Sequence, residues 1–133
     1  MKLEQNWRSK SVTVLENSDY GDPETAPTPL VKRCLEYVRI PVGNLDIEQL
    51  RLLIGQQIGL PYLIVQALTH LEKDILSEGD FYPGDLLKSI ISVDVLFWKA
   101  HSDLYRQLKT LIKKNKQKIA GEGINITSFL NYQ

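Results

Sequence analysis

Apolar residues recur every three or four positions along most of the chain, which is the period of an α-helix with one buried face. Five apolar stretches carry this signal: 30–38, 47–58, 60–75, 86–98 and 104–112. Regular alternation of apolar and polar residues, which is typical of a half-buried strand, is not strong anywhere. We therefore predict an all-α fold, a single compact domain over residues 1–133 that contains a bundle of about five to six helices.

Capping residues predict where several of these helices begin. Thr28 followed by Pro29 is a hydroxyl N-cap with proline in the first turn. Asp46 with Gln49 three positions on has the spacing of a capping box. Pro61 is expected to open the next helix, which has two apolar faces and should be the most buried in the domain.

Two segments rich in proline and glycine are predicted to be irregular. Residues 18–29 contain three prolines and form an N-terminal loop, and residues 79–85 (GDFYPGD) form a compact turn. We expect Asp85 to cap a helix over 86–98. In the same region, Phe81, Tyr82 and Trp98 are expected to pack in the core.

Length and composition limit the class of protein. The 133 residues are 43% apolar and 24% charged, as in ordinary globular domains of this size. The longest uncharged apolar stretch, 58–68, is too short for a membrane span, and no apolar segment follows Met1 as in a secretory signal. The single cysteine, Cys34, cannot form an internal disulfide. These features favour a cytoplasmic protein without membrane association.

The formal net charge is zero, but the charges are distributed unevenly. Residues 72–94 hold six acids and two bases, whereas residues 99–118 hold seven bases and one acid. We expect one acidic and one basic region on the folded protein, and fields of this kind steer charged partners.

No catalytic or cofactor-binding pattern is present. His70, His101 and Cys34 are not spaced as metal ligands, and the glycines match neither of the common phosphate-binding loops. Asp80 and Asp85 suggest a metal site or an acid–base pair, yet the favoured interpretation is a helix cap for Asp85 and bonding to turn amides for Asp80. We predict no enzyme activity, no metal and no cofactor.

The basic helix over Lys99–Lys118 supports an alternative function. Its lysines would suit the phosphates of a nucleic acid, with affinity that depends on salt. Tyr105 is the only nearby aromatic residue for base stacking. A solvated polar face is the favoured interpretation, so nucleic-acid binding remains the second hypothesis, and a ligand-binding bundle without a polar pocket is a third.

Two sequence segments in the centre of the chain resemble those of one protein family. LLIGQQIGL (residues 52–60) and EGDFYPGDLL (78–87), with Phe97-Trp98 after them, resemble the small all-helical immunity proteins of bacterial contact-dependent growth inhibition (CDI) systems. The resemblance covers about residues 30–112. Tyr20 in the early acidic loop is a fair counterpart of an aromatic residue in the family pattern.

The resemblance implies a cytoplasmic binding protein rather than an enzyme. Its partner would be the toxin domain at the C-terminus of a large secreted exoprotein, often a nuclease and most commonly a ribonuclease. A nuclease site is basic because it holds phosphate, so its inhibitor gains by presenting carboxylates. We select five acids in or beside loops as candidate toxin-binding residues: Asp19, Asp22, Asp74, Glu78 and Asp80.

Overall fold

The computed structural model describes residues 3–132, and its regular secondary structure is all helical, with no strand in that part of the chain. Nine α-helices occur in the described residues, five of them with seven or more residues, which confirms the all-α prediction. Their bounds in chain order are α1 Val12–Glu16, α2 Pro29–Tyr37, α3 Ile47–Gly55, α4 Leu60–Lys73, α5 Asp85–Ile91, α6 Val95–Ala100, α7 Ser102–Lys114, α8 Lys116–Gly121 and α9 Thr127–Leu130.

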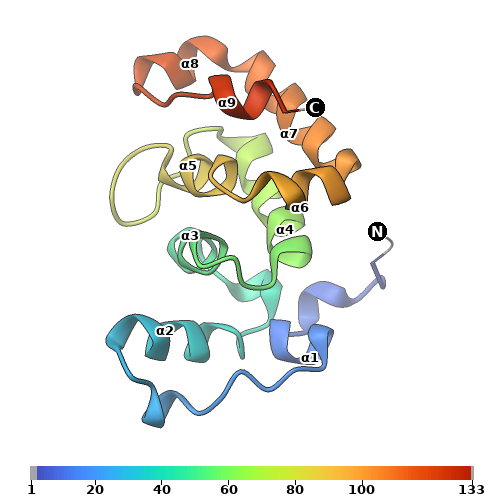
Figure 1. Ribbon diagram of the computed structural model, residues 1–133, viewed down its shortest axis with the longest axis vertical. Helices are drawn as coiled ribbons and strands as arrows, with labels where there is room; N and C mark the ends of the chain where they lie inside the picture. The colour runs from blue at the N-terminus through green and yellow to red at the C-terminus, as the bar shows by residue number, and fades with distance from the viewer. Residues whose placement is uncertain (1–2, 133) are drawn as a thin grey trace.

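The helices are stacked along one long axis (Figure 1). α1 and α2 lie at one end, α7, α8 and α9 lie at the other, and α3, α5 and α6 lie between them. The central helix α4 contacts α3, α5 and α7. Its sequence carries apolar residues on two faces, and six of its side chains are buried. The helix beginning near Pro61 thus has the largest number of buried side chains among the helices of residues 3–132, but it is not the most buried by share, because five of the seven residues of α5 are buried. Through α3 and α7, α4 connects the two ends of the stack.

Three short 3₁₀ turns complete the N-terminal half: η1 Trp7–Ser9, η2 Pro23–Thr25 and η3 Val42–Asn44. η1 packs against η3, and an isolated bridge pairs Ser11 with Pro41. The Trp7 indole is buried at this junction. Residues 7–13 are therefore fixed to the segment between α2 and α3 by one buried ring and a few backbone hydrogen bonds.

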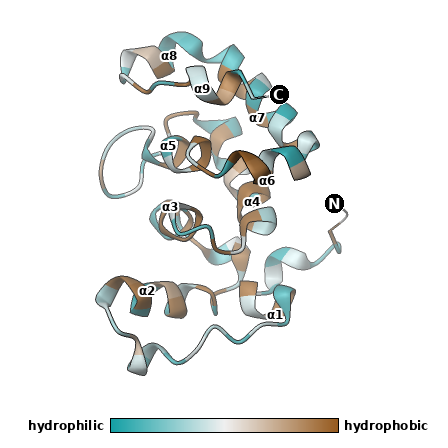
Figure 2. Ribbon diagram, viewed as in Figure 1, coloured by the Kyte–Doolittle hydropathy of each residue, from teal (hydrophilic) through white to brown (hydrophobic). Residues whose placement is uncertain are grey.

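The apolar faces of the helices point inward and meet in one continuous core (Figure 2). At the C-terminal end, Trp98 is 2% exposed and packs edge-on against Phe97 and Phe129. Trp98 was expected in the core and is confirmed there. Cys34 is buried too, and burial raises the pKa of its thiol, as expected for an inert cysteine.

Local signals predicted most helix starts correctly. Thr28 accepts a hydrogen bond from the Val31 amide, with Pro29 in the first turn of α2. Asp46 and Gln49 form both halves of a capping box at α3. Gly59 adopts a left-handed conformation with φ 61° and is the N-cap residue of α4. The preceding helix, α3, ends four residues earlier at Gly55.

Two predicted helices are each interrupted, so more helices are present than expected. The stretch 86–98 divides after Ile91, because Asp94 begins a new helix by accepting from the Leu96 amide. The last long helix divides at Asn115, whose side-chain amide donates to the Leu111 carbonyl. In both places a short polar side chain bonds the backbone and competes with helix continuation.

The first testable prediction concerns Gly84, which precedes α5 with φ +87°. An added Cβ there would meet Ile124 at the C-terminal end of the core, in a backbone conformation that alanine disfavours. We expect Gly84→Ala to lower the free energy of unfolding by about 1–2 kcal/mol in urea titrations. The control is Gly121→Ala, where nothing lies within 4 Å of the added Cβ and no loss is expected. Equal effects of the two substitutions would contradict this assignment.

Candidate functional site

The loop that joins α4 to α5, residues 74–84, projects from the side of the helical stack (Figure 1). Its backbone is held by two carboxylates from neighbouring helices. The Asp85 carboxylate accepts hydrogen bonds from the amides of Gly79 (2.6 Å), Phe81 (3.0 Å) and Tyr82 (3.4 Å). The Glu48 carboxylate, from the first turn of α3, accepts from the Asp80 amide at 2.9 Å. Four consecutive loop amides, those of residues 79–82, therefore donate hydrogen bonds to the side chains of Asp85 and Glu48.

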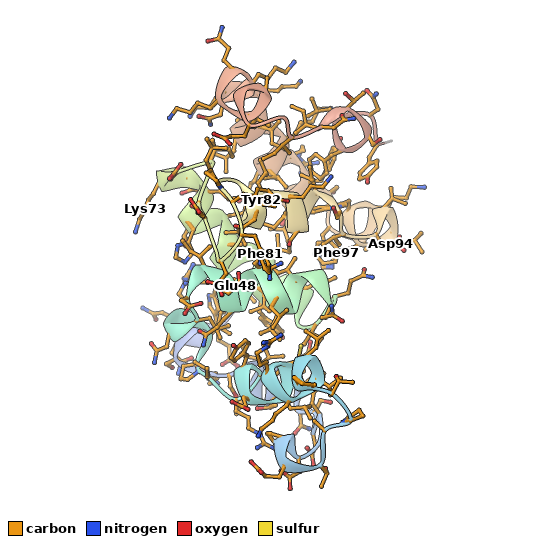
Figure 3. All side chains as sticks on the ribbon, turned by 90° about the vertical axis from the view of Figure 1, so that its left-hand side faces the viewer. Glu48, Lys73, Phe81, Tyr82, Asp94 and Phe97 are labelled. Atoms are coloured by element: carbon orange, nitrogen blue, oxygen red, sulfur yellow. The ribbon has the colours of Figure 1, made fainter. Side chains whose placement is uncertain are left out.

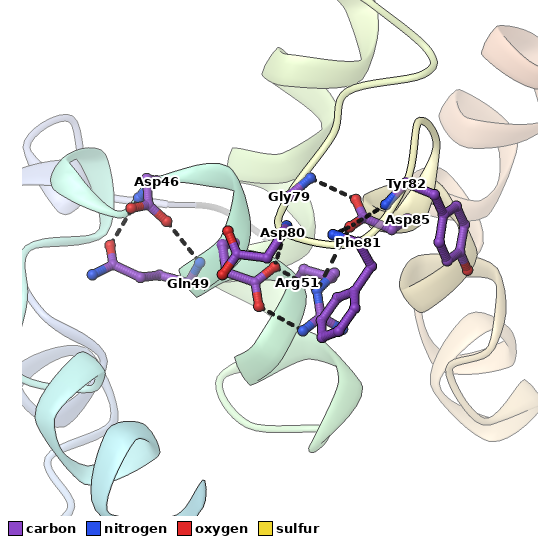
Figure 4. Close-up of polar contacts among 9 residues, drawn as sticks. Asp46, Gln49, Arg51, Gly79, Asp80, Phe81, Tyr82 and Asp85 are labelled. Atoms are coloured by element: carbon purple, nitrogen blue, oxygen red, sulfur yellow. Dashed lines mark hydrogen bonds and ion pairs between the residues drawn. The ribbon is translucent and has the colours of Figure 1, made fainter.

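Arg51 connects these two carboxylates (Figure 4). Its guanidinium donates twice to Glu48, at 2.7 and 2.6 Å, and its Nε lies 4.0 Å from Asp85. The same guanidinium lies 4.6 Å from the centre of the Phe81 ring and makes a cation–π contact with one face of it. Glu48 and Arg51 are three positions apart, which places them on one face of α3.

This arrangement changes the predicted role of Asp85. The side chain is 3% exposed and holds the turn that precedes it, but it makes no capping hydrogen bond to α5, where Gly84 is the N-cap residue. An aspartate that caps a helix and an aspartate that anchors a loop can both follow glycine in the sequence. The two roles can be distinguished only when the three-dimensional path of the loop is known.

The prediction that Phe81 and Tyr82 are core residues is wrong. Phe81 is 68% exposed and Tyr82 is 44% exposed. Their amides face inward to Asp85, and this orientation turns both side chains outward. Asp80 was expected to bond turn amides with its carboxylate; instead its own amide donates to Glu48.

The loop borders two hollows. One, of about 420 Å³, lies between α3, the loop and α5 and is lined by Arg51, Phe81, Tyr82 and Lys88 among others. The other, of about 430 Å³, is lined chiefly by acidic and apolar side chains together with His70: Asp46, Ile47, Glu48, Glu78, Gly79 and Asp80. Burial lowers the pKa of His70, which favours its neutral form. The second hollow is therefore dominated by carboxylates.

All five candidate toxin-binding acids are exposed, but they do not form one cluster. Glu78 and Asp80 line the same acidic hollow. Asp19 and Asp22 lie in the loop between α1 and α2, where their carboxylates accept from the amides of Gly21 and Glu24. Asp74 is the C-cap residue of α4, and its carboxylate accepts a hydrogen bond from the amide of Leu76. The last three acids thus have local turn roles besides their exposure.

Sequence reasoning missed Glu48, Arg51 and Asp46 as parts of this surface. The three-residue spacing of Glu48 and Arg51 was a usable sign of a helical ion pair. Nothing in the sequence indicated that this pair lies beneath a loop thirty residues later. The structure describes no group of three or more His, Cys, Asp or Glu suited to a metal ion in residues 3–132. No helix in the same residues is long and apolar enough to cross a membrane.

A second testable prediction follows from the Glu48–Arg51 pair. The hydrogen bonds from Arg51 hold the pKa of Glu48 below its ordinary value of 4.5, so the folded protein keeps this carboxylate charged to lower pH than the unfolded chain does. The stabilisation is full above about pH 4.5 and is lost as the pH falls through the lowered pKa. We expect Glu48→Gln to cost about 1 kcal/mol of unfolding free energy at pH 7 and a smaller amount near pH 3.

The matched control is Glu72→Gln, an exposed carboxylate of α4 that takes part in no ion pair within residues 3–132. Its effect should be small at both pH values. Urea titrations from pH 3 to pH 7 measure both differences, and a Glu48→Gln effect that does not change with pH would contradict the role of the ion pair.

Comparison with known proteins identifies the family. The profile of a family described as CDI immunity proteins matches residues 14–108. The match begins earlier than the resemblance noted from the sequence, so it includes the loop with Asp19 and Asp22, and it also includes Glu48, Arg51 and Asp85. No curated protein and no solved structure matches the chain significantly. Because the matched residues make up most of the chain, this protein belongs to the family of CDI immunity proteins.

Proposed function

We propose that this protein neutralises, by stoichiometric binding in the cytoplasm, the cognate toxin domain at the C-terminus of a large secreted CDI exoprotein. Membership of the family of CDI immunity proteins carries the proposal, because such a protein has a toxin as its partner. We further propose that the toxin is a nuclease, with ribonuclease the favoured class. The protein then acts through a surface, and it needs no catalytic group of its own.

The charge on the loop face supports a nuclease as the partner. An enzyme that holds phosphate presents a basic active site, and carboxylates on an inhibitor attract such a site over long range. Glu78 and Asp80 are exposed beside Glu48 and Asp46 in the acidic hollow. A backbone held by Asp85 keeps these acids in place, which lowers the cost of ordering them on binding.

The basic region supports the second hypothesis, nucleic-acid binding. Lys113 and Lys114 at the end of α7 and Lys116 and Lys118 in α8 are all exposed. The inward face of α7 is apolar, with Leu104, Leu108 and Ile112 buried, so its lysines occupy a solvated face. That arrangement is also usual for a surface helix, and nucleic-acid binding is therefore tested as an alternative outcome below.

The third testable prediction concerns binding and its salt dependence. The probe is the C-terminal domain of the cognate exoprotein, whose gene we expect to adjoin the gene of this chain. We expect a one-to-one complex and loss of the toxin's nuclease activity on its formation. The double reversal Glu78→Lys/Asp80→Lys should slow association about tenfold at low salt, with the difference shrinking as ionic strength rises. The parallel reversal Asp19→Lys/Asp22→Lys tests the other acidic loop.

The matched control is Lys113→Glu/Lys116→Glu on the basic helices. Stopped-flow association rates against ionic strength compare the three double variants with the unaltered protein. The proposed function is wrong if the unaltered protein neither binds the toxin domain nor blocks its activity. If only the lysine reversals change the rate, the acidic-surface account is wrong and the toxin docks through an acidic face on the basic helices. That result would also revive the nucleic-acid hypothesis.

A further inference from the structure

The most exposed aromatic residue among residues 3–132 lies on the loop that Asp85 and Glu48 anchor. Phe81 is 68% exposed, and its ring contacts the Arg51 guanidinium on one side. Figure 3 looks onto this face and shows Phe81 and Tyr82 near its middle, with Glu48 beside them, whereas Asp94 and Phe97 lie at its edge. A phenylalanine held in water adds little to folding stability, because its apolar area is not removed from solvent.

The loop presents these two rings with little freedom to adapt. The amides of Gly79, Phe81 and Tyr82 end on Asp85, and the Gly84 amide donates to the Leu76 carbonyl at 3.0 Å, which closes the base of the loop. Because this conformation forms on folding, a partner that binds the rings need not order the loop. Preorganised aromatic side chains are the groups that contribute most to protein interfaces.

The surroundings of the rings indicate the chemistry of the partner. The two hollows beside the loop together hold five carboxylates and two cations: Asp46, Glu48, Glu78, Asp80 and Asp85 with Arg51 and Lys88. Phe81 and Tyr82 line the hollow that holds Arg51, Lys88 and the buried Asp85. The other four carboxylates line the second hollow, so the rim is acidic on that side of the loop. An acidic rim repels a nucleic acid and attracts a basic protein face.

We propose that Phe81 and Tyr82 are the anchor by which the protein docks on its toxin, inserting into an apolar socket bordered by basic side chains. This inference rests on the proposed function and names the part of the surface that performs it. The hollow of about 420 Å³ beside the rings receives a side chain of the toxin in return. Acidic residues of the rim guide the encounter, and the rings determine how long the complex lasts.

The experiment compares Phe81→Ala with Leu96→Ala. Leu96 in α6 is also 68% exposed, so each substitution removes an equally exposed apolar side chain from a different element. We expect Phe81→Ala to raise the dissociation rate of the complex with the toxin domain about 30-fold or more, and Leu96→Ala to change it less than threefold. Phe81→Leu should fall between, because it keeps much of the apolar area. Surface-plasmon resonance measures the rates, and urea titrations should give nearly equal unfolding midpoints for all four proteins.

Each outcome separates this inference from the proposed function. If the unaltered protein binds the toxin domain and Phe81→Ala dissociates as slowly, the anchor is elsewhere and the proposed function stands. If the unaltered protein does not bind, both fail. Analytical ultracentrifugation of the free proteins gives a further outcome: a dimer that Phe81→Ala abolishes, with toxin binding unchanged, would show that a second copy of this chain occupies the rings.

Discussion

Arg51 bridges Glu48 and Asp85, and the two carboxylates bind the amides of residues 79–82. This set of contacts requires α3 and α5 to pack side by side, since each helix supplies one carboxylate. Burial of apolar side chains in the core determines how the two helices pack, and this packing determines the conformation of the loop (Figure 4). The positions of the groups on the loop face, from the acids of the rim to the two exposed rings, therefore depend on these two carboxylates and on the guanidinium between them.

The sequence predicted those features that are encoded over a few neighbouring residues. The period of apolar positions gave an all-helical fold, and Thr28 and Asp46 gave two helix starts. The breaks at Asp94 and Asn115 were missed because a polar residue at a helix face reads as solvated until its hydrogen bond is known. For function, the resemblance of two central segments to CDI immunity proteins was more informative than any periodicity or charge pattern, and the family match confirms it.

The loop face could not be predicted in the same way. Phe81 and Tyr82 read as core residues because large aromatic side chains are usually buried. Their exposure follows from Asp85, whose carboxylate draws the loop amides inward and leaves the side chains outside. Glu48 is 32 residues from Asp80 in the sequence, so its part in the same network depends on tertiary packing alone. Candidate acids chosen by loop position thus included Glu78 and Asp80 but not Glu48, which binds the amide of Asp80.

Hydroxyl-radical footprinting of the unaltered protein, free and in complex with the toxin domain, tests the central claim most directly. The radical oxidises exposed aromatic side chains, and Leu96 serves as an exposed reference outside the proposed interface. The account predicts that binding strongly reduces oxidation of Phe81 and Tyr82 and leaves Leu96 unchanged. Unchanged oxidation of both rings, with protection confined to the residues of α7 and α8, would contradict it.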